Sequence, residues 1–67
     1  MHYEVKHAPQ EPAWTVIEVN GDVRKVVETH YGDHCDANER RYARERALAL
    51  ARTLARKNNT RVVQTTV

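Results

Sequence analysis

Residues 36–57, DANERRYARERALALARTLARK, decide the fold because they read as one long helix. At about 100° per residue, most of the alanines and leucines of this segment gather on one face: Ala43, Ala47, Leu50, Ala51, Leu54 and Ala55, with Leu48 at the edge. Asp36, followed three residues later by Glu39, is typical of an N-cap with its capping-box partner. Asn58 and Asn59 predict the end of the helix, since asparagine accepts the left-handed conformation. We therefore predict a helix over residues 37–57, about 30 Å long.

Two segments rich in β-branched residues precede this helix, residues 14–19 and residues 23–31. Asn20-Gly21-Asp22 lies between them. Asn-Gly is the strongest short hairpin signal, because both residues tolerate a positive φ. The two segments are therefore predicted to pair as an antiparallel hairpin.

The two ends of the chain are predicted to add further strands. Residues 60–67, rich in Val and Thr, favour a closing strand, and residues 2–6 favour a short edge strand. Both prolines fall within residues 8–12 and predict a connector. The predicted class is α+β in the order (β)ββαβ, an antiparallel sheet of three or four strands with one long helix packed on one face. We expect one small domain over residues 1–67, with its ββαβ core in residues 13–67.

The core is expected to take most of its bulk from the strands, because the apolar face of the helix is mostly alanine. Alanine lets the helix approach the sheet closely and leaves space for a large side chain. Trp14 is expected at the centre of the core, since the only other large side chains are three tyrosines. Val16, Val27 and one valine of the Val62-Val63 pair are expected to pack around it.

The sheet is predicted to have apolar residues on both faces. Neighbouring residues of a strand point to opposite faces, and Val-Ile or Val-Val pairs occur in each of the last three strands. One helix covers only one face, so Ile17, Val19 and Val26 are expected to be exposed on the other. An exposed apolar patch on so small a protein favours a partner, and we predict that these three residues form a homodimer or another protein interface. The alternative is that the N-terminal segment, with Tyr3 and Val5, folds over the patch.

Positive charge is concentrated in the helix. Residues 37–58 carry seven Lys and Arg against two Glu, a net charge of +5, while the rest of the chain carries −3. Arginine is the preferred residue for bidentate phosphate contacts, so nucleic acid is the alternative partner. The competing interpretation is a solvated face, stabilised by an i,i+4 ion pair between Arg41 and Glu45. The candidate nucleic-acid contacts are Arg41, Arg52 and Arg56 on one arc of the helix, with Arg46 and Lys57 on another.

Residues that often carry chemistry do not form a catalytic or metal-binding motif. His30, His34 and Cys35 lie close in the sequence but lack the paired spacing of a zinc site. Adjacent side chains in a turn rarely point together, so Cys35 is not expected to have a base within reach. With only Gly21 and Gly32 in the chain, no glycine loop is available to cradle a phosphate. We predict no catalytic residue, no metal site, no cofactor and no small-molecule substrate.

The composition also indicates where in the cell the protein is expected. A single cysteine suits a reducing cytosol better than secretion. No apolar run approaches the roughly 20 residues needed to span a membrane, and residues 1–5 lack the blocks of a signal peptide. We expect a cytoplasmic, non-enzymatic binding module without a membrane partner, compatible with a small bacterial or phage accessory protein.

Two stretches carry a resemblance to known domains. AWTVIEVNGDVRKVVETHYG at residues 13–32 and YARERALALARTLARKNNTRVV at residues 42–63 resemble small bacterial domains of unknown function. Those domains have a Trp-led hairpin, an alanine-rich helix and a closing Val-Val strand. The resemblance implies a compact α+β domain with no assigned catalytic residues.

The helix is also similar to the last helix of the double-stranded-RNA-binding domain. Ala43, Ala47 and Leu50 match the alanine and leucine spacing of that helix. The first helix of that family is missing here, its lysine pair is replaced by residues 39–41, and its fold does not end in a strand. This resemblance implies RNA binding as the runner-up function.

Overall fold

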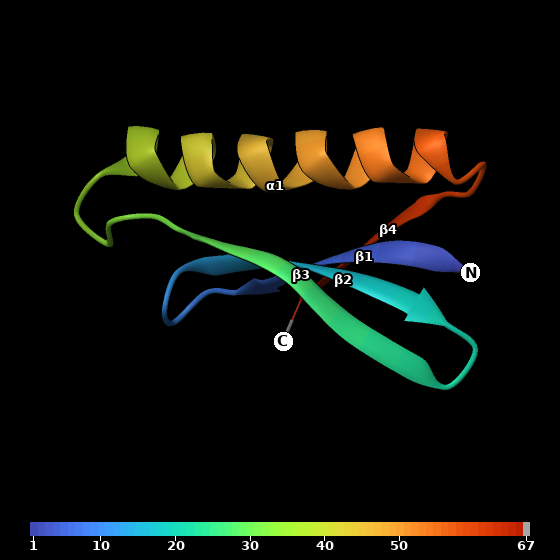
Figure 1. Cartoon of the computed structure of the whole chain (residues 1–67). Helices are drawn as coiled ribbons and strands as arrows, with labels where there is room; N and C mark the ends of the chain where they lie inside the picture. Colours follow the sequence, from blue (N-terminus) through green and yellow to red (C-terminus); the bar gives the residue numbers. More distant parts are fainter. Residues whose placement is uncertain (67) are drawn as a thin grey trace.

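The structure, a computed structural model, describes residues 1–66 as one four-stranded sheet with one helix across it (Figure 1). The elements are β1 (His2–Ala8), β2 (Ala13–Asn20), β3 (Val23–Tyr31), α1 (Ala37–Lys57) and β4 (Val62–Thr66). The predicted α+β class, the element order and the bounds of the helix are confirmed. The predicted closing strand extended to residue 67, which lies outside the described residues.

The sheet is mixed, and its strand order is β3-β2-β1-β4. β1 pairs antiparallel with β2 on one side and parallel with β4 on the other. The prediction of a wholly antiparallel sheet is therefore wrong, as is the prediction that residues 2–6 form an edge strand. The reason is that α1 is a crossover connection: it returns the chain to the edge beside β1, in the direction of β1.

The core lies between α1 and the face of the sheet that the helix covers. Tyr3 and Val5 belong to this core, so the alternative in which they cover the far face is wrong. Trp14 is in the core at 6% exposure, but Tyr3 and Val16 are the largest fully buried side chains. The sheet residues meet a helix face made of Ala43, Ala47, Leu48, Ala51 and Ala55, with Val62 packed at the margin.

Val27 does not join the core, contrary to the prediction. In the pairing of β2 with β3, Val16 lies opposite Glu28 while Ile17 lies opposite Val26. Val27 is therefore the extra residue of a β-bulge, without a partner in β2. Its side chain is 41% exposed. The strict alternation on which the prediction rested fails at this residue.

Both ends of α1 are capped as predicted, with one difference. Asp36 Oδ1 accepts hydrogen bonds from the backbone N–H groups of Asn38 (2.9 Å) and Glu39 (3.2 Å). The Asp36 N–H donates to the Asp33 carbonyl at 3.2 Å, and no bond from the Glu39 side chain to that N–H occurs within residues 1–66. The reciprocal half of the capping box is thus not formed. At the other end Asn58 is the C-cap and Asn59 adopts φ of 53°.

We expect Asp36→Ala to lower the free energy of unfolding by about 1 kcal/mol, because it removes the acceptor for two N–H groups. Asp36→Asn keeps an oxygen acceptor and is expected to lose much less. Urea denaturation of both variants beside the wild type measures the difference. Equal losses for the two substitutions would contradict the capping role.

Candidate functional site

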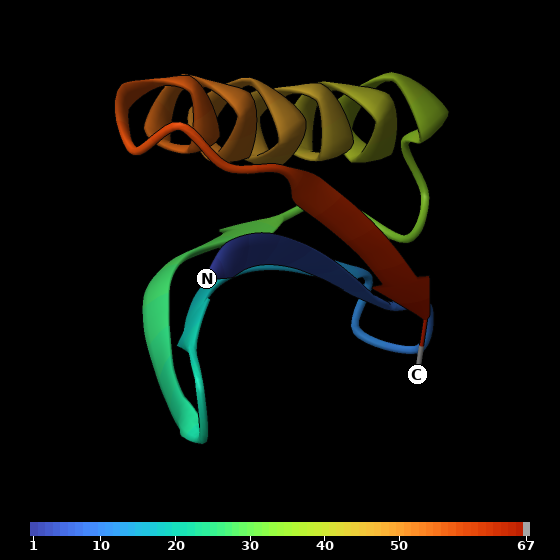
Figure 2. The ribbon, with the colours of Figure 1, turned by 90° about the vertical axis from the view of Figure 1, so that its right-hand side faces the viewer.

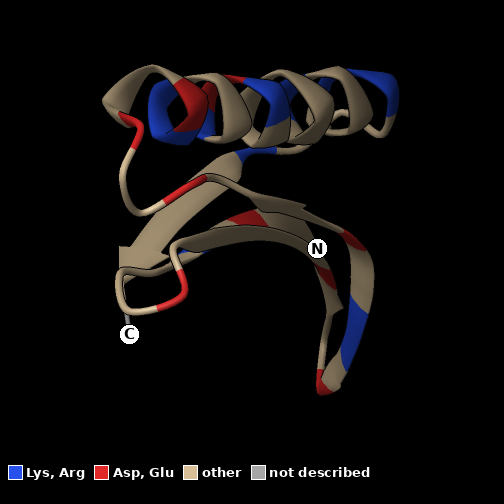
Figure 3. Ribbon diagram, turned by 90° about the vertical axis from the view of Figure 1, so that its left-hand side faces the viewer, with Lys and Arg blue, Asp and Glu red and all other residues tan. Residues whose placement is uncertain are grey.

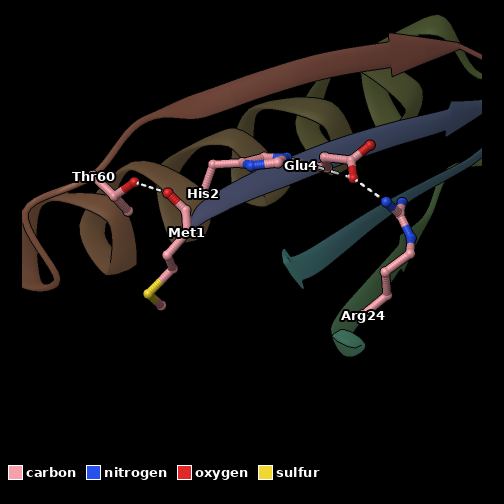
Figure 4. Close-up of polar contacts among 5 residues, drawn as sticks. All are labelled: Met1, His2, Glu4, Arg24 and Thr60. Carbon is pink, nitrogen blue, oxygen red and sulfur yellow. Dashed lines mark hydrogen bonds and ion pairs between the residues drawn. The ribbon is translucent and has the colours of Figure 1, made fainter. Parts of the chain in front are cut away.

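The far face of the sheet is concave, because the sheet curves away from α1 (Figure 2). On this face Glu4 of β1 and Arg24 of β3 form an ion pair at 2.6 Å (Figure 4). His2 Nε2 lies 3.8 Å from the same carboxylate. Nearby, the Thr60 hydroxyl donates to the Met1 carbonyl and fixes the start of β1 beside the segment that leads into β4.

The Glu4–Arg24 ion pair crosses over β2. Glu4 lies opposite Ile17 and Arg24 lies opposite Val19, and directly opposed residues share a face of the sheet. Ile17 and Val19 are each only 7% exposed. The prediction that they form an exposed patch is therefore wrong, because a charged pair and the curvature of the sheet cover them. Val26, at 62% exposure, is the one member of the predicted interface that is accessible.

The exposed apolar residues of the sheet lie instead on the edge strand β3. Val23, Val26, Val27 and Tyr31 are 41–69% exposed. β3 pairs only with β2, so the backbone N–H and C=O groups along its outer edge have no partner strand within residues 1–66. An exposed edge with apolar side chains is a template for pairing with another chain.

Arg24 also controls the charge of Glu4. The guanidinium donates to the carboxylate and lowers the pKa of Glu4 below its ordinary value, against the effect of burial, which raises it. Glu4 is the one buried charged residue of the described chain. The charge of Glu4 is balanced by Arg24, which lies on the strand at the other side of β2. No pattern in the sequence indicates that these two residues are neighbours.

The cationic residues of α1 have no acidic partners in the described chain. Among residues 1–66 no Lys or Arg of α1 lies within 4.0 Å of a carboxylate, so the predicted Arg41–Glu45 ion pair is wrong. Arg40 donates instead to the carbonyls of Asp33 (3.0 Å) and His34. Lys and Arg recur along the helix (Figure 3).

Arg46 is separated from the other arginines of the predicted site. Its guanidinium donates to the Tyr42 hydroxyl at 3.1 Å and lies 5.4 Å from the centre of the Tyr42 ring. The side chains of Arg41, Arg52 and Arg56 are exposed and make no hydrogen bond or ion pair with the described residues. The three primary candidates are therefore free to bind an external anion, whereas Arg46 is engaged within the helix.

A shallow depression of about 430 Å³ lies where the start of α1 meets the β1–β2 turn. Arg40, Arg41 and Arg44 line it on the helix side, and His7 and Trp14 line it on the sheet side. The rings of His7 and Trp14 are stacked, with centroids 4.5 Å apart and planes at 4°. Sequence reasoning missed His7 and Arg44 here, because nothing local indicated that β1 runs beneath the helix.

Gly32 holds the start of the helix close to this depression. Its N–H donates to the Pro12 carbonyl at 3.1 Å. A Cβ at this position would lie 2.6 Å from Arg40 Cα. The close approach places the first turns of α1, with their arginines, over the β1–β2 turn.

The histidines and the cysteine are not gathered into a site. Within residues 1–66 no group of three or more His, Cys, Asp or Glu side chains has a geometry that could hold a metal ion. Cys35 is exposed in the turn before α1, where its N–H donates to Asp33 Oδ1 at 2.8 Å. His30 Nε2 lies 3.4 Å from the Glu28 carboxylate on β3.

No protein family, curated protein or solved structure matches this chain. The two resemblances drawn from the sequence therefore stay predictions. None of the described helices is long and apolar enough to cross a membrane.

The ion pair at Glu4 predicts a pH-dependent stability. A carboxyl whose pKa is lowered by folding stabilises the protein above its ordinary pKa, near 4.5, and this contribution is lost as the pH falls further. We expect Glu4→Gln to lower the free energy of unfolding by about 1 kcal/mol at pH 7, since Arg24 is half-exposed. At pH 3 the difference from the wild type should largely vanish.

The control for this experiment is Glu11→Gln, which changes an exposed glutamate of the β1–β2 turn. Unfolding of the three proteins by urea at both pH values measures the effect. A Glu4→Gln deficit that is the same at pH 3 and pH 7 would show that lost packing, and not the ion pair, is responsible.

Proposed function

We propose that this protein is a small non-enzymatic interaction module that forms a homodimer through the β3 side of its sheet, and that it acts in the cytoplasm as an accessory protein. The observation that carries this proposal is that the edge strand β3 has exposed apolar side chains and no partner strand on its outer side within residues 1–66. β3 is nine residues long, and its exposed side chains include Val23, Val26 and Val27. β3 pairs only with β2, so the backbone N–H and C=O groups along its other edge are available to a second chain.

The charges of β3 support antiparallel pairing between two copies. Arg24 and Lys25 lie near one end of the strand, and Glu28 lies toward the other. Antiparallel pairing centred on Val26 and Val27 brings the cations of one copy beside the carboxylate of the other. Parallel pairing in register would bring like charges together, which is destabilising. The same charges discourage indiscriminate edge-to-edge aggregation.

We expect Val26→Lys to weaken self-association at least tenfold while the monomer stays folded, since Val26 is exposed and not in the core. Ala49→Lys is the matched control, because it adds the same charge on the exposed surface of α1. Sedimentation equilibrium over a range of protein concentrations measures the association. Ile17→Lys is not a suitable probe, because it would bury a charge and unfold the chain.

A wild-type protein that is monomeric at high concentration would overturn the homodimer. Equal association constants for Val26→Lys and the wild type would show that a dimer uses some other surface.

A second candidate function is nucleic-acid binding by Arg41, Arg52 and Arg56, with Arg46 and Lys57 secondary. The observation that favours it is the lack of any carboxylate within 4.0 Å of the cations of α1 in the described chain. In a merely solvated face, interspersed glutamates commonly pair with the arginines. Glu39 and Glu45 are present in α1 but take no such partner.

The test of this candidate is the triple change Arg41→Gln, Arg52→Gln and Arg56→Gln. If these residues bind phosphates, the affinity for nucleic acid should fall strongly. The slope of log affinity against log salt concentration should also become less steep, by about one for each lost contact. The matched comparison is between two double changes: Arg41→Gln with Arg52→Gln on α1, and Lys6→Gln with Arg61→Gln, which removes two exposed cations outside α1 and outside β3. Fluorescence anisotropy at several salt concentrations measures both quantities. Equal losses of affinity for the two double variants would show that only the net charge matters and would contradict a binding site on the helix.

A further inference from the structure

Three depressions lie along one flank of α1, and two of them also reach β4. The first, of about 430 Å³, lies at the start of the helix and is lined by Arg40, Arg41 and Arg44. The second, of about 250 Å³, shares Arg44 with the first and extends to Gln64 and Thr66 of β4. The third, of about 450 Å³, is lined by Arg52 and Arg56 and reaches Val62 at the start of β4. We call these three depressions together the α1–β4 groove.

The arginines of the groove come from one flank of the helix. Arg41, Arg44, Arg52 and Arg56 fall within a sector of about 120° at 3.6 residues per turn. Arg41 and Arg56 are about 22 Å apart along the helix axis. None of the residues that line the three depressions is acidic, and the strand side offers neutral polar groups such as Gln64 and Thr66. The groove is therefore suited to an extended polyanion.

The first depression adds a flat ring surface to this charge. Trp14 is 6% exposed and His7 is half-buried, and the imidazole is stacked on the indole. Pro9 and Pro12 complete an apolar rim around the two rings. A cationic groove that tracks a backbone, with a ring on which a base stacks, is the arrangement by which proteins bind single strands. Histidine is among the side chains that stack on unpaired bases.

We propose that the α1–β4 groove binds single-stranded nucleic acid, with phosphates on Arg41, Arg44, Arg52 and Arg56 and one base on the His7–Trp14 stack. This inference deepens the second candidate function and rests on it. It adds His7 and Arg44 to the predicted contacts and removes Arg46, which donates to Tyr42 on a different arc of the helix.

The geometry of α1 favours a single strand over a duplex. A helix that enters the major groove presents its outermost ridge to the bases. The outermost ridge of α1 carries Tyr42, Glu45, Ala49 and Thr53, all exposed, with Arg56 among them and with Arg46 and Arg52 each about 20° beyond one of its edges. Arg44 and Arg52 lie on the flank beside β4, and Arg41 lies over the β1–β2 turn. A flexible strand follows such a flank, whereas a rigid duplex contacts the ridge first.

The experiment measures binding of a fluorescent oligothymidylate of about ten nucleotides and of a duplex of the same length. We expect the single strand to bind more tightly than the duplex at equal salt, and to quench the fluorescence of Trp14, the single tryptophan of the chain. His7→Ala should weaken single-strand binding about tenfold. His7→Phe, which keeps a ring, should retain most of the affinity.

Two variants that each remove one positive charge provide a matched pair. Arg44→Gln should reduce affinity severalfold and lower the salt slope by about 0.7. Lys6→Gln removes one exposed positive charge from β1, outside the groove, and should change neither quantity. Circular dichroism and urea denaturation of each variant verify that it is folded.

The outcomes separate this inference from the function on which it rests. Tight duplex binding without single-strand binding would overturn the inference and leave the nucleic-acid function standing. Failure to bind either probe at low salt would overturn both. Displacement of the oligonucleotide by polyglutamate at equal charge concentration, together with no effect of His7→Ala, would show a general anion groove and overturn the inference.

Discussion

The parallel pairing of β4 with β1 is the constraint on which the rest of the structure depends, and Tyr3 holds it in place. The Tyr3 N–H donates to the Arg61 carbonyl at 3.0 Å, just before β4. The buried Tyr3 hydroxyl donates to Glu18 of β2 at 2.9 Å and accepts from the Asn58 side chain at 3.0 Å. One side chain thus joins β1, β2 and the end of α1. Burial and the Glu18 carboxylate both raise the pKa of Tyr3, which keeps the phenol protonated as the donor.

This pairing also determines which edges of the sheet stay open. With β1 inside the sheet, β3 is left at one edge and β4 at the other. The proposed dimer surface and the α1–β4 groove therefore lie at opposite edges. Two copies joined at β3 would form a continuous sheet, with one groove at each outer end. Neither function requires the other, and a dimer would present two grooves to one polyanion, which increases avidity without new contacts.

Local signals in the sequence were sufficient for the elements but not for their neighbours. The Asn20-Gly21 turn, the Asp36 cap and the alanine spacing of α1 depend on nearby residues, and all were predicted. The parallel partner of β1 depends on where a 21-residue helix returns the chain, which no local pattern encodes. The bulge at Val27 and the ion pair from Glu4 to Arg24 likewise depend on register. Those two features decided which candidate interface residues are exposed. His7 lies in the candidate site because β1 runs beneath the helix, and no local pattern in the sequence indicates that position.

The separation of charge between helix and sheet arises because two carboxylates of the sheet are bound by partners within the sheet. Glu4 is held by Arg24 on the far face, and Glu18 accepts from Tyr3. Neither carboxylate lines the α1–β4 groove. The alanine face of α1 lets the helix lie close to the sheet, so the arginines at its flank stand beside β4 rather than far above it. Small side chains in the core therefore set the depth of a cationic surface, and internal partners for Glu4 and Glu18 hold these two carboxylates away from it.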